Sequence, residues 1–142
     1  MKVRDVMTQK PIHISKDETV AVAARTLTHY NIGAVPVCYS DGKVCGMVTD
    51  RDMVTRCLAA GKDPERTKVA DVMTGGVITA GPDMGLEDAA AIMGSKQVRR
   101  LPVVENGKLC GMVSLGDLAV NRESDGQAGQ ALSQISSNIS AR

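Results

Sequence analysis

The sequence has almost no aromatic side chains: phenylalanine and tryptophan are absent, and the only tyrosines are Tyr30 and Tyr39. Valine, isoleucine, leucine, methionine and alanine must therefore build the core. A bound purine would lie between aliphatic side chains, because no aromatic platform is available on which it could stack.

Long apolar runs are also missing, and none approaches the roughly 20 residues that a membrane-spanning helix needs. The first residues contain no apolar stretch of the kind found in signal peptides. We therefore expect a cytoplasmic protein with no membrane partner. The four cysteines would then lie in a reducing compartment, where disulfides are rare.

Neither sign of charge is in excess, since the net charge is +1 and the isoelectric point is near 7.7. Lysine and arginine are scattered along the chain, which disfavours a nucleic-acid partner.

The G-x-S-x-G, P-loop and H-E-x-x-H motifs are absent, so we expect a protein that is not an enzyme and has no catalytic residues. There is no C-x-x-C motif, and the two histidines are 16 positions apart, so we expect no metal site and no required cofactor.

What the sequence does contain is an internal duplication. Residues 3–8 (VRDVMT) recur as residues 69–74 (VADVMT), and residues 41–49 (DGKVCGMVT) recur as residues 106–114 (NGKLCGMVS). The halves should form two similar units, each too small for a good core alone, packed about a pseudo-twofold axis with ligand clefts between them. We predict the following division: repeat 1 over 1–62, a linker over 63–68, repeat 2 over 69–122, and a polar tail over 123–142.

Each repeat follows the order strand, helix, strand, strand, helix, which predicts a mixed α/β (α+β) fold. In the first copy we expect a strand over 12–14, a helix with the face Val20, Ala23, Ala24 and Leu27, strands over 34–38 and 44–48, and a helix over 49–60 ended by Gly61. The matching face of the second copy is Leu86, Ala89, Ala90 and Met93, and its last helix is shorter, over about 115–122. Asp41-Gly42 and Asn106-Gly107 predict tight hairpins.

The tail places Leu132, Ile135 and Ile139 at helical spacing. This pattern predicts a short amphipathic helix. Because the segment is rich in serine, the helix would be stable only if its apolar face docks.

Each repeat ends its last strand with a hydroxyl residue followed three positions later by an aspartate. Thr49 precedes Asp52, and Ser114 precedes Asp117. This spacing is that of a capping box, which satisfies free backbone N–H groups at a helix start. The same groups suit a nucleotide, since a carboxylate can accept hydrogen bonds from the two hydroxyls of a ribose. A cap and a nucleotide site are compatible.

The order of these motifs resembles a cystathionine-β-synthase (CBS) domain pair, a Bateman module. The resemblance rests on the duplicated D-V-M-T opening, the I-G-A-V-P-V and V-R-R-L-P-V strands and the two Thr/Ser-x-x-Asp ends, and it covers residues 1 to about 122. It implies a stand-alone regulatory module that binds adenosine-type ligands, that pairs into homodimers through its helices, and that acts on a separate effector. AMP, ADP, ATP, NADH, S-adenosylmethionine and cyclic dinucleotides all carry the adenosine that such a module accepts.

The resemblance also implies roles for individual residues. Asp52 and Asp117 would bind ribose hydroxyls, with Thr49 and Ser114 beside the ribose or phosphate. His13 and Thr79 hold matching places on the first strands, near the base, and Thr79 fits the family pattern better.

The two sites should not be equivalent. Gly33 and Ala34 occupy the positions that Arg99 and Arg100 occupy in the second copy, and Arg51 lies inside the first Thr/Ser-x-x-Asp motif only. Small residues admit a base edge closely, whereas paired guanidinium groups can bind phosphate. A solvated charge pair is the alternative interpretation of the two arginines.

The cysteines suggest a competing hypothesis. If Asp41-Gly42 forms a two-residue loop, Cys38 faces Cys45 across the hairpin, within reach of a disulfide. The matching Cys110 would face Val103 and have no partner. Buried thiols without chemistry are the simpler interpretation.

Three functions therefore stay open. The first is a sensor of adenosine-type ligands. The second is a structural or adaptor protein with vestigial clefts, acting through its dimer face or its tail. The third is an oxidoreductase that uses Cys38 and Cys45.

Overall fold

The computed structural model describes residues 1–120 and 125–140, apart from the side chains of residues 125 and 137–140. The chain forms two compact units. Unit 1 combines Met1–Pro11 with Ile78–Arg142, and unit 2 is the continuous stretch Ile12–Val77. Each unit holds a three-stranded sheet with helices packed on it, which confirms the predicted mixed α+β class.

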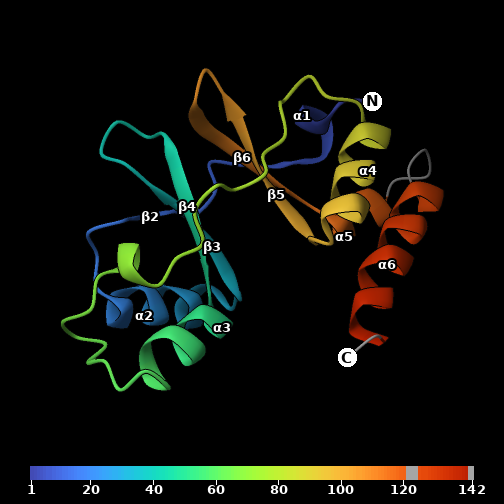
Figure 1. The fold of residues 1–142 in the computed structure, drawn as a ribbon. Coiled ribbons are helices and arrows are strands. Elements are labelled where there is room, and N and C mark those ends of the chain that lie inside the picture. Colours follow the sequence, from blue (N-terminus) through green and yellow to red (C-terminus); the bar gives the residue numbers. More distant parts are fainter. Residues whose placement is uncertain (121–124, 141–142) are drawn as a thin grey trace. The chain divides into compact units, whose positions relative to one another are not determined.

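Unit 2 is built on a sheet with the order β2-β3-β4, in which β2 is parallel and β4 antiparallel to the central β3 (Figure 1). Its elements are β2 (Ile14–Ser15), α2 (Val20–Tyr30), β3 (Ala34–Cys38), β4 (Val44–Thr49), α3 (Asp50–Met53), a π-helical turn (Val54–Leu58) and a 3₁₀ turn (Val69–Asp71). The predicted first strand over 12–14 is therefore shorter and displaced. The predicted second helix is present as α3 and the π-helical turn, and Gly61 follows it with the expected positive φ of 72°.

Unit 1 repeats this plan with the sheet order β1-β6-β5. Its elements are α1 (Val3–Val6), β1 (Thr8–Gln9), α4 (Leu86–Lys96), β5 (Arg100–Glu105), β6 (Lys108–Ser114), α5 (Leu115–Ala119) and α6 (Asp125–Ser140). The residue pairs Ile14–Val37 in unit 2 and Ala80–Val103 in unit 1 are parallel bridges at matching positions, as the duplication requires.

Each unit takes its first segment from the other repeat. In unit 1, β1 pairs with β6, so that Thr8 lies opposite Met112. In unit 2, Thr74 forms the matching bridge with Met47, through hydrogen bonds of 2.8 and 3.0 Å. The V-x-D-V-M-T segment of each repeat therefore completes the sheet that carries the body of the other repeat. We call residues 3–8 and 69–74 the exchanged arms.

The predicted helix faces form the two cores. In α4, Leu86, Ala89, Ala90 and Met93 are all buried, and in α2 the buried residues include Val20, Ala23 and Leu27, with Ala24 half-buried. The exchanged arms contribute Val3 to the core of unit 1 and Val69 and Val72 to that of unit 2. Aliphatic residues, methionine and alanine fill both cores, together with Cys57 in unit 2, as the shortage of aromatic residues predicts.

The two hairpins differ from one another. Asn106 and Gly107 both have positive φ, and Glu105 pairs with Lys108, so the second hairpin has the predicted two-residue turn. In the first hairpin Tyr39 N–H donates to the Lys43 carbonyl, and of its loop residues only Gly42 has positive φ. The first loop is therefore three residues long, and the prediction of two is wrong.

The longer loop changes which residues face one another near the cysteines. Cys38 lies opposite Val44, and Cys45 is the extra residue of a β-bulge. The facing of Cys38 and Cys45 that a two-residue loop would give is therefore absent, and both thiols are free, as in the simpler interpretation. A matching bulge contains Cys110, which consequently does not face Val103. Both bulge thiols donate to a strand carbonyl, Cys45 to Val37 at 3.3 Å and Cys110 to Val103 at 3.4 Å.

The tail forms α6, which packs against α4 and α5 within unit 1 (Figure 1). Its buried residues are Ala128, Ala131 and Ile135, whereas Leu132 is 40% exposed. The predicted helix therefore exists and docks, but through a face of smaller residues than expected, and the side chain of Ile139 lies outside the described residues. The small face fits because Gly94 of α4 lets α6 approach closely, with Ala131 Cα 3.2 Å from where a Cβ on residue 94 would be.

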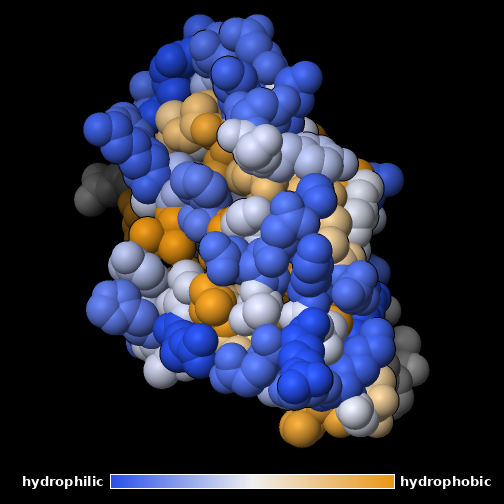
Figure 2. All heavy atoms as spheres, turned by 90° about the vertical axis from the view of Figure 1, so that its left-hand side faces the viewer, coloured by the Kyte–Doolittle hydropathy of each residue, from blue (hydrophilic) through white to orange (hydrophobic). Residues whose placement is uncertain are grey.

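On the face drawn in Figure 2, hydrophilic side chains predominate and apolar ones reach the surface in small separate patches. The most exposed large apolar side chains among the described residues are Val120, at 86%, and Leu58, at 72%. In the part of the chain that the structure describes, no helix combines the length and the apolar character that a membrane crossing requires.

Candidate functional site

Both predicted capping boxes are present. In unit 2 the Asp52 N–H donates to Thr49 Oγ1 at 3.0 Å, and the Thr49 N–H donates to Asp52 Oδ2 at 3.0 Å. In unit 1 the Asp117 N–H donates to Ser114 Oγ at 3.1 Å, and the Ser114 N–H donates to Asp117 Oδ2 at 2.8 Å. The residue pairs thus begin α3 and α5, and their geometry is the same in the two units.

The caps leave part of each carboxylate available. Only Oδ2 of Asp52 and of Asp117 is used by the cap, and the described residues provide no donor for Oδ1 in either case. All four capping residues are half-buried. Each box therefore presents a fixed carboxylate oxygen that can accept a hydrogen bond from a hydroxyl group.

The residues that precede the central strand lie beside these helix starts. The Asp50 N–H donates to the Gly33 carbonyl at 3.0 Å, and the Leu115 N–H donates to the Arg99 carbonyl at 2.7 Å. Ala34 pairs with Thr49 across β3 and β4, and Arg100 pairs with Ser114 across β5 and β6. The structure therefore brings Gly33 and Ala34 together with the first box, and Arg99 and Arg100 together with the second.

The charges at these two places are opposite. The carboxylate of Asp50 lies next to Gly33, with Oδ2 3.5 Å from where a Cβ on residue 33 would be. In unit 1 the equivalent residue is the apolar Leu115, and the neighbours are the exposed side chains of Arg99 and Arg100. The predicted lack of equivalence is thus a difference in charge, with an added acid in unit 2 and added cations in unit 1. Asp50 was not among the predicted site residues, although its place inside the motif could have indicated it.

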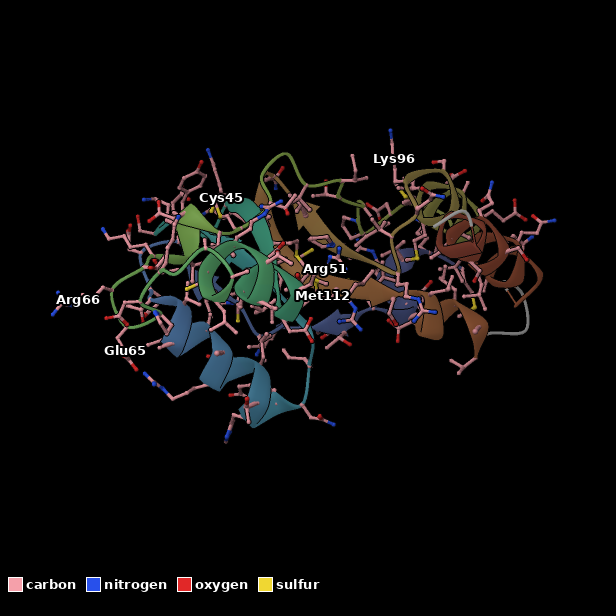
Figure 3. All side chains as sticks on the ribbon, turned by 60° about the horizontal axis from the view of Figure 1, so that its bottom comes forward. Cys45, Arg51, Glu65, Arg66, Lys96 and Met112 are labelled. Atoms are coloured by element: carbon pink, nitrogen blue, oxygen red, sulfur yellow. The ribbon has the colours of Figure 1, made fainter. Side chains whose placement is uncertain are left out.

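Arg51, the cation within the first motif, is the second residue of α3 (Figure 3). Its side chain is exposed, and no carboxylate of a described residue pairs with it. Its backbone is anchored, since its N–H donates to Asp50 Oδ1 at 2.8 Å.

His13 and Thr79 are less closely tied to the boxes. His13 is exposed and lines a hollow of about 410 Å³ together with Glu18, Cys38 and Tyr39, and none of the other predicted site residues lines that hollow. Thr79 is also exposed and precedes Ala80, which bridges to Val103 of β5. Their proposed place beside a base stays a prediction.

A larger hollow lies in unit 1 and includes part of the second site. It has a volume of about 510 Å³, and we call it the α6 pocket. Its lining comes from the start of β5, from the end of β6, from α5 and from α6. The lining residues are Arg99, Arg100, Ser114, Leu115, Gly116, Ala119, Ala128, Gly129 and Leu132. Asp117 does not line it. Sequence reasoning missed the contribution of α6, because nothing in the tail indicates which helix face turns toward the arginines.

The thiols are poorly suited to redox chemistry. Burial raises the pKa of Cys38 to about 11, with smaller effects of the same sign from Cys45 and Asp41. Burial likewise raises the pKa values of Cys45 and Cys110. Because the thiolate is the reactive form, these shifts disfavour the hypothesis of an oxidoreductase that uses Cys38 and Cys45.

Among the described residues there is no cluster of three or more histidine, cysteine, aspartate or glutamate side chains that could hold a metal ion.

Comparisons with known proteins agree with the duplicated fold. The family model of the CBS domain matches residues 3–59 and 69–122. The chain is similar to the CBS domain-containing protein YhcV of Bacillus subtilis, with 43% identity over 134 residues that cover 94% of each chain.

Two solved structures are also similar. Hypoxic Response Protein I, with two coordinated zinc ions, has a TM-score of 0.79 and 31% identity, covering 85% of this chain and 98% of its own. The CBS domain pair of protein MJ0100, in complex with 5-methylthioadenosine and S-adenosyl-L-methionine, has a TM-score of 0.74 and 27% identity, covering 84% and 94%. Since the family model matches most of the chain in two copies, the chain belongs to the CBS domain family.

Proposed function

We propose that this protein is a regulatory module, without catalytic activity of its own, that binds adenosine-type ligands at its two capping boxes. Asp52 and Asp117 would accept hydrogen bonds from the ribose hydroxyls, with Thr49 and Ser114 holding the carboxylates in place. The observation that carries the proposal is the pair of half-buried carboxylates whose Oδ1 atoms lack a donor among the described residues. The MJ0100 domain pair, which holds two adenosine compounds, supports the ligand class.

The opposite charges indicate that the two sites prefer different ligands. A phosphate would be attracted to Arg99 and Arg100 in unit 1 and repelled by Asp50 in unit 2. We therefore assign AMP, ADP or ATP to the site of Ser114 and Asp117. The site of Thr49 and Asp52 would take an uncharged or cationic adenosine compound such as S-adenosylmethionine, with Gly33 and Ala34 at the base edge.

We further propose that the protein is a homodimer that signals to a separate effector protein. In unit 2 the turn after α3 exposes Val54, at 54%, and Leu58, at 72%, one helical turn apart. Burying such a pair against a second copy would remove apolar surface from water. Light scattering after size-exclusion chromatography tests this: Leu58→Glu should shift a dimer toward monomer, whereas Leu58→Met should not.

Thermal unfolding with a panel of AMP, ADP, ATP, NADH and S-adenosylmethionine tests the ligand class. A ligand at 100 times its dissociation constant should stabilise the folded protein by about 2.7 kcal/mol. Asp117→Asn should abolish the shift caused by the nucleotides, and Asp52→Asn the shift caused by S-adenosylmethionine. Asparagine is the informative replacement, because its amide oxygen can keep the cap while the carboxylate charge is lost.

Asp5 provides a matched control. Its Oδ2 accepts a hydrogen bond of 2.8 Å from the Lys2 N–H in a similar box, which begins α1 and neither α3 nor α5. Asp5→Asn should therefore leave every ligand shift unchanged. If Asp52→Asn and Asp117→Asn also keep every shift, the ribose assignment is wrong, and if no compound stabilises the protein, the ligand class is wrong.

A further inference from the structure

The α6 pocket has the size and composition of a small-molecule site, and its two arginines are those to which the proposed function assigns the nucleotide phosphate. Its volume of about 510 Å³ falls within the usual range for ligand pockets, roughly 300–1,000 Å³. One part of its wall is cationic, from Arg99 and Arg100. Another part is apolar, from Ala128 and Leu132 of α6 and Ala119 of α5.

The two arginines have no acid to neutralise them in the part of the chain that the structure describes. Two other acids of unit 1, Asp83 and Glu105, are paired with Arg4, at 2.7 and 3.9 Å. Because both arginines line the pocket, an anion placed in it would be attracted by two positive charges. The N–H groups of each planar guanidinium group can donate two parallel hydrogen bonds to a phosphate, sulfonate or carboxylate group.

The pocket also lies on a different side of α5 from the proposed ribose carboxylate. Leu115, Gly116 and Ala119 line the pocket, and Asp117 does not. At 3.6 residues per turn, position 117 points roughly 150° away from the mean direction of those three positions. Ser114 borders both places, so they are neighbours that do not share their main contacts.

We propose that the α6 pocket binds an amphiphilic anion, with its charged group on Arg99 and Arg100 and its apolar body against α6. The helix then forms part of the site and sets which ligand bodies fit. Gly129 is the residue through which this can be tested, because a Cβ at this position would meet no atom within 4 Å. A large side chain there would enter the pocket without disturbing the packing of α6.

The probe is 8-anilinonaphthalene-1-sulfonate, a fluorescent sulfonate with an apolar body, titrated into the full-length chain. We expect saturable binding of one probe per chain. Gly129→Phe should abolish it, and the double substitution Arg99→Gln with Arg100→Gln should weaken it about tenfold or more, since hydrogen bonds to charged groups contribute about 1.5–3 kcal/mol.

Two control variants separate these effects from general ones. Gly126→Phe places the same side chain on α6, at another position where a Cβ would meet nothing within 4 Å but which does not line the pocket. Lys96→Gln removes an exposed charge from the end of α4 in the same unit (Figure 3). Both should bind the probe as the unchanged protein does. Circular dichroism establishes that all variants are folded.

Three results would overturn the proposal: no saturable binding to the unchanged protein, equal binding by Gly129→Phe and Gly126→Phe, or equal binding by the double arginine variant and Lys96→Gln.

A competition with AMP identifies the source of the anion. Displacement of the probe by AMP means that the pocket receives the phosphate end of the proposed nucleotide. Retention of the probe in the presence of bound AMP means that a separate amphiphilic anion occupies it. Because the probe needs no ribose contact, failure of the nucleotide assignment would leave this test intact.

Discussion

Replacing Gly46 with alanine should destabilise the protein, because an exchanged arm lies directly over this glycine. A Cβ on residue 46 would lie 2.7 Å from Met73 Sδ and 2.7 Å from the Thr74 carbonyl oxygen. The sulfur is at the flexible end of a side chain and can move. The carbonyl oxygen cannot move freely, because it accepts the Met47 N–H at 3.0 Å while the Thr74 N–H donates back to Met47 at 2.8 Å.

The expected size follows from these contacts. Overpacking of this kind costs about 1–3 kcal/mol. Alanine in a strand is better than glycine by roughly 0.5–1 kcal/mol, which offsets part of the cost. We therefore expect Gly46→Ala to lower the free energy of unfolding by about 1 kcal/mol, and by no more than about 2.5 kcal/mol. Gly111→Ala should cost less, since the backbone oxygen of Thr8 is 3.0 Å from its Cβ position and the closer atom is the movable Met7 Sδ.

Urea unfolding followed by circular dichroism measures both effects. Gly81→Ala is the matched control, since its Cβ would meet nothing within 4 Å and its φ is not positive, so it should be neutral or slightly stabilising. If Gly46→Ala unfolds at the same urea concentration as Gly81→Ala with an unchanged m-value, the close packing of the arm on β4 is refuted.

Three further predictions concern the tail, a thiol and the caps. Ile135→Ala should lower the free energy of unfolding by about 2–5 kcal/mol, and Leu132→Ala, at a position 40% exposed, by clearly less; equal effects in urea unfolding would contradict the docked face of α6. The raised pKa of Cys38, about 11, favours the protonated thiol in the folded state, so its stabilising contribution should be complete below about pH 8.5 and be lost as the pH rises toward 11. Cys38→Ala should therefore flatten the loss of stability between pH 8.5 and 11, and an unchanged pH profile would count against the shift. Thr49→Ala and Ser114→Ala should each cost about 0.5–2 kcal/mol in thermal or urea unfolding through loss of a cap, and values near zero would mean that the caps do not form in solution.

Local patterns in the sequence predicted local structure well. The duplication predicted two equivalent sheets with helices on them, helical spacing identified the buried faces of α2 and α4, and the spacing of Thr49 and Asp52 predicted the cap that is observed. These features depend on residues close in sequence, so the pattern itself determines the geometry.

Features that depend on the third dimension were not predictable. Cys38 lies opposite Val44 and not Cys45 because the first loop is one residue longer than a two-residue turn. Cys110 does not face Val103 because a β-bulge, present in both hairpins, shifts the register. Of the predicted face of α6, Ile135 is buried but Leu132 is 40% exposed, because the close approach of α6 to Gly94 places Ala131 in the contact instead. The α6 pocket depends on that same approach, so no sequence motif could have indicated it.

The exchange of arms has a consequence for how such a chain could have arisen. A polypeptide with a single repeat would have a sheet without the arm that pairs with it. Its own arm would have no sheet with which to pair. Two such molecules, trading arms, would satisfy both needs at once. Joining two repeats in one chain supplies both arms within a single molecule, so that neither sheet depends on a second chain for its missing neighbour.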